Sequence, residues 1–153
     1  MRKGVFFPSP DPAFCRTLIY EAPDAIIYAD VGGMIQLWNR GAERIFGFSQ
    51  SEALGKSLDL IIPENLRKRH WDAYSHTMKT GQTRYGAGDL LAVPAVRKDG
   101  VRISIEFSIL PLRDRQGNMT GVAAILRDVS KRFGETKALR EEVAALRKRI
   151  QDL

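Results

Sequence analysis

His70 is the residue of this chain best suited to hold a metal or a cofactor. It falls in a stretch of helical periodicity that follows Pro63, and this stretch predicts a helix to about Lys79. On such a helix it shares one face with Leu66, Ala73, Tyr74 and Thr77. An imidazole on this face can bind a metal through one nitrogen, and one axial histidine in an apolar slot is sufficient for haem. Haem b is therefore the leading cofactor candidate.

Two other readings of His70 stay open. It can be a histidine without haem that makes a hydrogen bond in the core or at the surface. Alternatively, the pocket can hold a small organic ligand between aromatic walls, with Arg69 or Arg84 as the anchor for a carboxylate. The residues expected to form those walls are Tyr28, Trp38, Phe46, Tyr74 and Tyr85. His76 adds no metal ligand, because it lies six residues after His70 and does not share its helix face.

The chain shows no catalytic constellation, and we expect that it is not an enzyme. It has no phosphate-binding loop, no nucleophile elbow and no paired carboxylates in a supporting context. Its single cysteine, Cys15, cannot form an internal disulfide, which predicts a reducing, cytoplasmic compartment. On an apolar helix face, Cys15 is interpreted as a small core residue.

The charge of the chain raises the question of nucleic acid. The 153 residues carry a formal net charge of +6, partly from Arg67-Lys68-Arg69 and partly from the last helix. There is no helix-turn-helix pattern, zinc spacing or aromatic-basic strand platform, so a solvated basic surface is the favoured interpretation. A basic, nucleic-acid-associated regulator is kept as an alternative. No apolar run approaches the roughly 20 residues of a membrane span, so no membrane partner is expected.

Hydrophobic periodicity predicts an α+β domain with one five-stranded antiparallel sheet and helices on one face. Two turns, Arg97-Lys98-Asp99-Gly100 and Asp114-Arg115-Gln116-Gly117-Asn118, each precede an alternating apolar run and predict two consecutive hairpins. Residues 89–96 form a further strand that Pro94 makes either an edge strand or a bulged one. The predicted segments are a flexible tail (1–10), an amphipathic helix (11–22), the domain (23–129) and a terminal helix (130–153).

The terminal helix carries an apolar seam. Its members are spaced four, three, four and three residues apart, as in the a and d positions of a coiled coil: Leu139, Val143, Leu146, Ile150 and Leu153. The seam predicts a homodimer, assisted by the domain surface or by the N-terminal helix. Because it spans barely two heptads and is marginal alone, packing of this helix on its own domain is the alternative.

Five short motifs, in order along the chain, resemble those of PAS domains. They are Pro23-Asp24-Ala25-Ile26-Ile27, Trp38-Asn39-Arg40-Gly41-Ala42-Glu43-Arg44-Ile45-Phe46-Gly47-Phe48, Glu52-Ala53-Leu54-Gly55-Lys56, Lys98-Asp99-Gly100 and Arg127-Asp128-Val129-Ser130. The resemblance covers roughly residues 15 to 130. It implies a helical pocket against a five-stranded sheet, used for ligand sensing and dimerisation, and a role for Asp128 in tying the last strand to the signalling helix.

The stretch from His70 to Gly81 is also similar to haem-binding PAS domains of oxygen-sensing proteins. This similarity implies that His70 is the axial ligand of the haem iron, in a pocket with Tyr74, Leu90, Trp38 and Ile105. Leu90 stands where those families carry a distal arginine, so CO, NO or redox sensing is considered beside oxygen. A covalent flavin photocycle is excluded, because the expected pocket contains no cysteine.

The sequence therefore predicts a sensory module that binds a small ligand or cofactor and signals through dimerisation and the C-terminal helix to an unknown downstream effector. A ligand-free dimerisation adaptor is the main alternative.

Overall fold

The computed structural model describes residues 11–83, 86 and 90–153. The predictions made for the tail at 1–10, for Arg84 and for Tyr85 lie outside the described residues.

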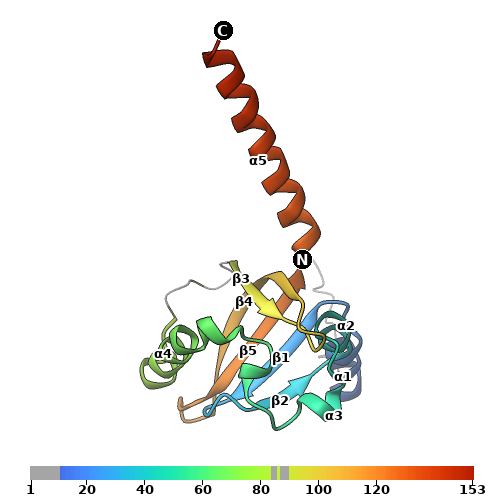
Figure 1. Cartoon of the computed structure of the whole chain (residues 1–153). Coiled ribbons are helices and arrows are strands. Elements are labelled where there is room, and N and C mark those ends of the chain that lie inside the picture. Colours follow the sequence, from blue (N-terminus) through green and yellow to red (C-terminus); the bar gives the residue numbers. More distant parts are fainter. Residues whose placement is uncertain (1–10, 84–85, 87–89) are drawn as a thin grey trace, which may run out of the picture.

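The predicted α+β fold is confirmed, with a five-stranded antiparallel sheet in the order β2-β1-β5-β4-β3. The strands are β1 (Ala25–Asp30), β2 (Ile35–Trp38), β3 (Leu91–Val96), β4 (Arg102–Arg113) and β5 (Met119–Asp128). The two predicted hairpins join β3 to β4 and β4 to β5 (Figure 1). The last strand of the chain, β5, thus occupies the middle of the sheet, between β1 and β4.

Pro94 lies in an edge strand and not in a bulge. It is opposite Ser104, and the register of β3 against β4 is continuous from Leu91 to Val96. A proline has no N–H to donate to a further strand. At the edge of the sheet there is no such strand, so no backbone hydrogen bond is lost.

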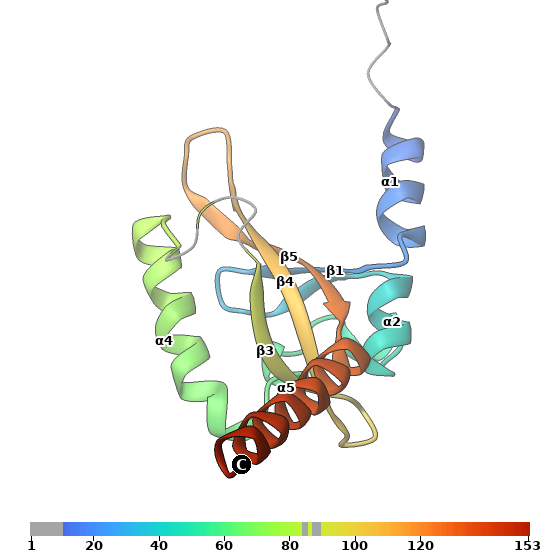
Figure 2. The same ribbon diagram turned by 90° about the horizontal axis from the view of Figure 1, so that it is seen from above.

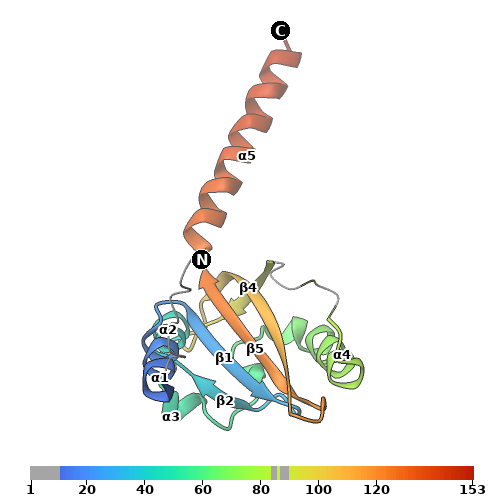
Figure 3. The same ribbon diagram turned by 180° about the vertical axis from the view of Figure 1, so that it is seen from behind.

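Helices lie around one face of the sheet. They are α1 (Pro12–Glu21), α2 (Arg40–Phe46), α3 (Gln50–Ala53), a 3-10 turn (Leu58–Leu60) and α4 (Glu64–Thr80). Seen from above, α4 flanks the strands on one side and α2 with α1 on the other (Figure 2). From behind, β1, β5 and β4 are seen with no helix lying across them (Figure 3). The short helix α3 begins with the capping box of Ser49 and Glu52, which satisfies two N–H groups of its first turn.

The core is centred on β2 and α2. Trp38 and Phe46 are fully buried, with ring centroids 5.5 Å apart. Asn39 is the polar member of this core and is also fully buried. Its Oδ1 accepts hydrogen bonds from the N–H groups of Ile26 and Ala42. Its Nδ2 donates to a backbone carbonyl near the end of α1 and to one just before β1. One side chain therefore joins α1, β1 and α2.

The last helix, α5 (Ser130–Gln151), extends away from the domain and has no buried residue (Figure 1). The side chains of its predicted seam, Leu139, Val143, Leu146 and Ile150, are between 45% and 69% exposed in the single chain. This exposure contradicts the alternative in which α5 packs on its own domain. In the part of the chain that the structure describes, no helix combines the length and the apolar character that a membrane span requires.

Candidate functional site

His70 lies on α4, where the helix meets the body of the domain. The ring is half-buried, and its Nδ1 is buried with no hydrogen-bond partner among the described residues. Burial lowers the pKa of His70 from its ordinary value of 6.5, and the nearby carboxylate of Asp59 opposes this shift. The imidazole is therefore neutral at pH 7, and a neutral imidazole has a nitrogen lone pair that a metal can accept.

Tyr74 lies next to His70 and fixes α4 to the sheet. The two rings have centroids 5.7 Å apart. The Tyr74 hydroxyl donates to the carbonyl oxygens of Ala29 (3.2 Å) and Asp30 (2.5 Å) at the end of β1. Burial is the main cause of an upward shift in the pKa of Tyr74, so its hydroxyl stays protonated and acts as a donor. His70 therefore stands on a helix whose position relative to β1 is set by a buried hydrogen bond.

Trp71 is a residue of this site that sequence reasoning missed. Its ring lies edge-on to His70, at 4.8 Å between centroids, and its Nε1 donates to Asp59 Oδ1 at 2.8 Å. The same ring covers Gly33 in the turn between β1 and β2, where a Cβ would overlap it. Gly33 also has a φ of 77°, which favours glycine. The only signal in the sequence was the place of Trp71 beside His70 on an amphipathic helix.

The structure brings Tyr74 together with His70 but not every other predicted pocket residue. Trp38 packs against Phe46 in the core, and its Nε1 donates to the Phe48 carbonyl. Ile105 is 3% exposed and belongs to the same core cluster. Leu90 is 65% exposed, just before β3, and does not lie in this core cluster.

Two smaller expectations are also corrected. Ala73 was expected on the inner face of the helix but is exposed, because the buried face of α4 runs through Tyr74 and Thr77. Cys15 was interpreted as a core residue but is exposed on α1. That helix has no buried residue, so its apolar face, with Phe14 and Leu18, is open to solvent.

The chemistry of this site is that of a single histidine ligand. Among the described residues, no three His, Cys, Asp or Glu side chains come together as a metal-binding group. A multi-ligand zinc-type centre would need such a group. For haem, one histidine from the protein is sufficient, because the porphyrin itself supplies the ligands in its plane. The neutral His70 with its unpartnered, buried nitrogen fits that requirement.

A network of hydrogen bonds anchors α5 to the sheet. Asp128 Oδ1 accepts from the N–H of Ser130 at 2.9 Å and from its hydroxyl at 2.6 Å. The same hydroxyl accepts from the N–H of Ser104 in β4 at 2.9 Å. Two residues further, Arg132 forms an ion pair with Glu106 at 2.9 Å. The first turn of α5 is thus bonded both to the end of β5 and to the first half of β4.

The family model for the PAS fold matches residues 13–129, well over half of the 153 residues, so the chain belongs to the PAS family. The chain is 36% identical over 94 residues to the sensor protein FixL of Bradyrhizobium diazoefficiens. The aligned region covers 61% of this chain and 18% of FixL. It is 23% identical over 143 residues to the oxygen sensor protein DosP of Escherichia coli. This aligned region covers 94% of this chain and 16% of DosP. The chain thus spans less than a fifth of either relative.

Solved structures give the same fold. A PAS domain from a Colwellia psychrerythraea protein superposes with a TM-score of 0.65 at 22% identity, over 76% of this chain and 95% of that chain. An RNA-binding light-oxygen-voltage receptor superposes with a TM-score of 0.69 at 22% identity, over 96% of this chain and 41% of that chain. At this identity the likeness establishes the architecture alone.

Proposed function

We propose that this chain is the sensory module of a signalling system, that it binds haem b through His70, and that it signals through dimerisation and α5. The observation that carries the proposal is the half-buried His70, whose Nδ1 has no hydrogen-bond partner in the described part of the chain. An unpaired buried polar atom is costly, and such an atom in a native fold calls for an explanation. A metal bound to the imidazole would explain why this ring has a buried nitrogen without a hydrogen-bond partner in the described part of the protein.

The neighbours of His70 have supporting roles in this proposal. Tyr74 and Trp71 supply the aromatic surface beside the ring, while their polar atoms are already engaged with β1 and Asp59. Both rings are therefore held in place and can orient the imidazole. Asp59 opposes the effect of burial on the pKa of His70, which keeps the basicity of the imidazole from falling further. Haem would supply an iron centre for a diatomic gas or for a change of oxidation state.

The similarity to a protein named as an oxygen sensor supports this class of signal. The flavin alternative has weaker support. The only cysteine of the chain, Cys15, lies on α1, so a covalent flavin photocycle has no nucleophile in α4. A ligand-free adaptor would keep the fold and the exposed seam of α5, but it would not explain the buried His70 nitrogen that has no hydrogen-bond partner among the described residues.

The proposal is tested by absorption spectroscopy of the purified chain with and without added haemin. We expect a sharp Soret band that shifts with CO and is lost in His70→Ala. The matched control is His76→Ala, since His76 is exposed on the same helix and should leave the band unchanged. Haem binding that survives in His70→Ala would contradict the role of His70. Protein absorbance alone, with no specific haemin uptake, would reject haem and favour a small organic ligand or the adaptor.

A further inference from the structure

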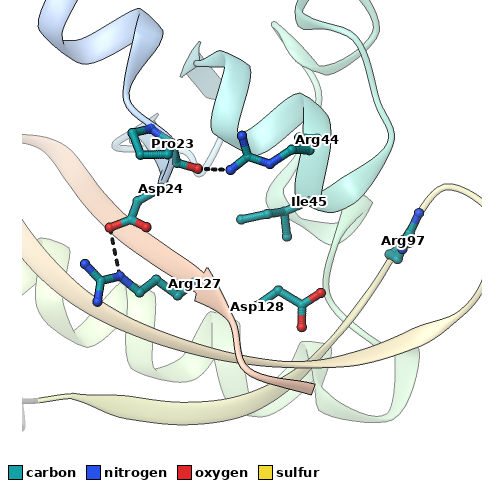
Figure 4. Close-up of a pocket in the computed structure, with 7 residues that line it drawn as sticks. All are labelled: Pro23, Asp24, Arg44, Ile45, Arg97, Arg127 and Asp128. Atoms are coloured by element: carbon teal, nitrogen blue, oxygen red, sulfur yellow. Dashed lines mark hydrogen bonds and ion pairs between the residues drawn. The ribbon is translucent and has the colours of Figure 1, made fainter. Parts of the chain in front are cut away.

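A cleft lies where the α1–β1 linker, α2, the start of the β3–β4 turn and the end of β5 meet. Its volume is about 370 Å³, within the range of small-ligand sites. It is lined by Pro23, Asp24, Arg44, Ile45, Arg97, Arg127 and Asp128. Figure 4 shows Arg44 of α2, Arg127 of β5 and Arg97 of the β3–β4 turn on different sides of Ile45. Three guanidinium groups around an open cleft form a basic lining that two aspartates only partly balance.

Arg97 contributes an unsatisfied donor to this cleft. Its Nε is buried and has no hydrogen-bond acceptor in the part of the chain described. Asp99 Oδ1 forms an ion pair with this nitrogen at 3.7 Å, beyond the distance of a hydrogen bond. The backbone of Arg97 is fixed, because its N–H donates to the Val101 carbonyl and its own carbonyl accepts from Gly100. The side chain as a whole is 38% exposed, and a guanidinium N–H without a hydrogen-bond acceptor is a position at which a ligand oxygen would be stabilised.

The other two arginines and both aspartates are engaged by the protein itself. Arg44 donates to the carbonyl of Pro23, and Arg127 Nε donates to Asp24 Oδ2 at 2.9 Å (Figure 4). Asp128 is held by its two hydrogen bonds from Ser130. A guanidinium has five N–H donors, so these single contacts leave Arg44 and Arg127 with donors for a second acceptor. Because the carboxylates are already paired or hydrogen-bonded, the cleft favours an anion over a cation.

We propose that this cleft binds a small oxyanion, a carboxylate or a phosphate group, through Arg44 and Arg97 with Arg127 at its edge. Planar guanidinium groups bind both kinds of oxyanion with paired, charge-assisted hydrogen bonds. The ligand would lie against Asp128, the residue that anchors α5, so its binding would act on the junction between the domain and the helix. This site is separate from the His70 site, on another part of the domain, and does not depend on haem.

The test follows the side-chain Nε–Hε resonances of the arginines by NMR while inorganic phosphate or acetate is added at constant ionic strength. We expect saturable shifts for Arg97 and Arg44, with the Ser130 amide shifting in parallel. Arg97→Gln and Arg44→Gln should each weaken binding by about tenfold to a hundredfold, the value of a charge-assisted hydrogen bond. The matched control is Arg40→Gln, because Arg40 is exposed on the same helix as Arg44 but is paired with Glu21 outside the cleft.

The two probes separate the sources of the oxyanion, since tighter binding of phosphate indicates a phosphorylated ligand and tighter binding of acetate a carboxylic acid. Shifts that do not saturate, or that weaken equally in Arg40→Gln, would show only general attraction to a basic surface and would overturn the proposal. If Arg97→Gln does not fold, Arg44→Gln decides. His70→Ala should bind the anion as the original chain does, so a failure of the haem proposal leaves this result unaffected.

Discussion

Replacement of Asn39 by alanine tests whether one buried side chain holds the N-terminal half of the domain together. Asn39 is 0% exposed. Its Oδ1 accepts from Ile26 N at 2.8 Å and from Ala42 N at 2.9 Å, and the second of these bonds caps α2. Its Nδ2 donates to the carbonyls of Ile19 at 2.9 Å and Asp24 at 3.0 Å, with a longer contact to the Ala22 carbonyl at 3.4 Å. Alanine removes all of these bonds and leaves their backbone partners behind.

The expected loss of stability can be worked out from these contacts. A buried polar group left without its partner costs about 1–3 kcal/mol, and loss of an N-cap costs about 0.5–2 kcal/mol. Ile19 and Asp24 are half-buried, so water can partly replace the lost donor there. The two N–H groups carry most of the penalty, which gives about 1.5–5 kcal/mol in total. At about 4 °C per kcal/mol for a chain of this size, the Tm should fall by about 6–20 °C.

Thermal unfolding followed by circular dichroism measures this loss. All variants are compared at one protein concentration, because dimerisation raises the apparent Tm. The control is Asn65→Ala, since Asn65 is exposed on α4 and accepts a single bond from Arg102. It should change stability by no more than about 0.5 kcal/mol. A Tm for Asn39→Ala that matches the control would refute the reasoning, because it would mean that water satisfies the whole network.

Three further predictions concern the site and the output helix. Burial lowers the pKa of His70 below 6.5, so below about pH 6.5 the unfolded chain binds more protons and the free energy of unfolding should fall. Urea unfolding should show a smaller fall in His70→Gln, and an equal fall would contradict the buried neutral imidazole. Asp128→Ala removes the acceptor for the Ser130 N–H and hydroxyl, which should loosen the first turn of α5 at a cost of about 0.5–2 kcal/mol. Unchanged helix content and unchanged dimer affinity would contradict this anchoring role of Asp128. Leu146→Asp places a charge in the apolar seam and should shift sedimentation toward monomer, whereas Ala145→Asp, on the neighbouring face, should not.

The sequence was most informative where structure depends on near neighbours. The capping box of Ser49 and Glu52 and the hairpin at Asp114–Asn118 involve residues no more than four positions apart, so the chain itself specifies them. The edge position of Pro94 also follows from a local property, its missing N–H. The order of these elements was then sufficient to predict the α+β fold.

The site was less predictable because its contacts join distant parts of the chain. Trp71 is held by Asp59, 12 residues away, and Tyr74 by the carbonyl of Ala29, 45 residues away. Periodicity placed His70 and Tyr74 on one helix face but could not tell which aromatic residues face the pocket. Trp38 was assigned to the pocket for its size, yet its indole N–H found an acceptor at Phe48 inside the core. Asn39 was visible as part of a motif, but its partners are spread over α1, the α1–β1 linker, β1 and α2.

The alternation of β4 explains how an event at the core could reach α5. Ile105 faces the core and is 3% exposed, while its neighbours Ser104 and Glu106 belong to the opposite face of the strand. Those neighbours are the residues that hold Ser130 and Arg132 of α5. Ile105 is also directly opposite Asp128 in the β4–β5 ladder. A displacement of the backbone at Ile105 would therefore move these anchors of α5 with it, because the anchoring residues are its two neighbours in the same strand.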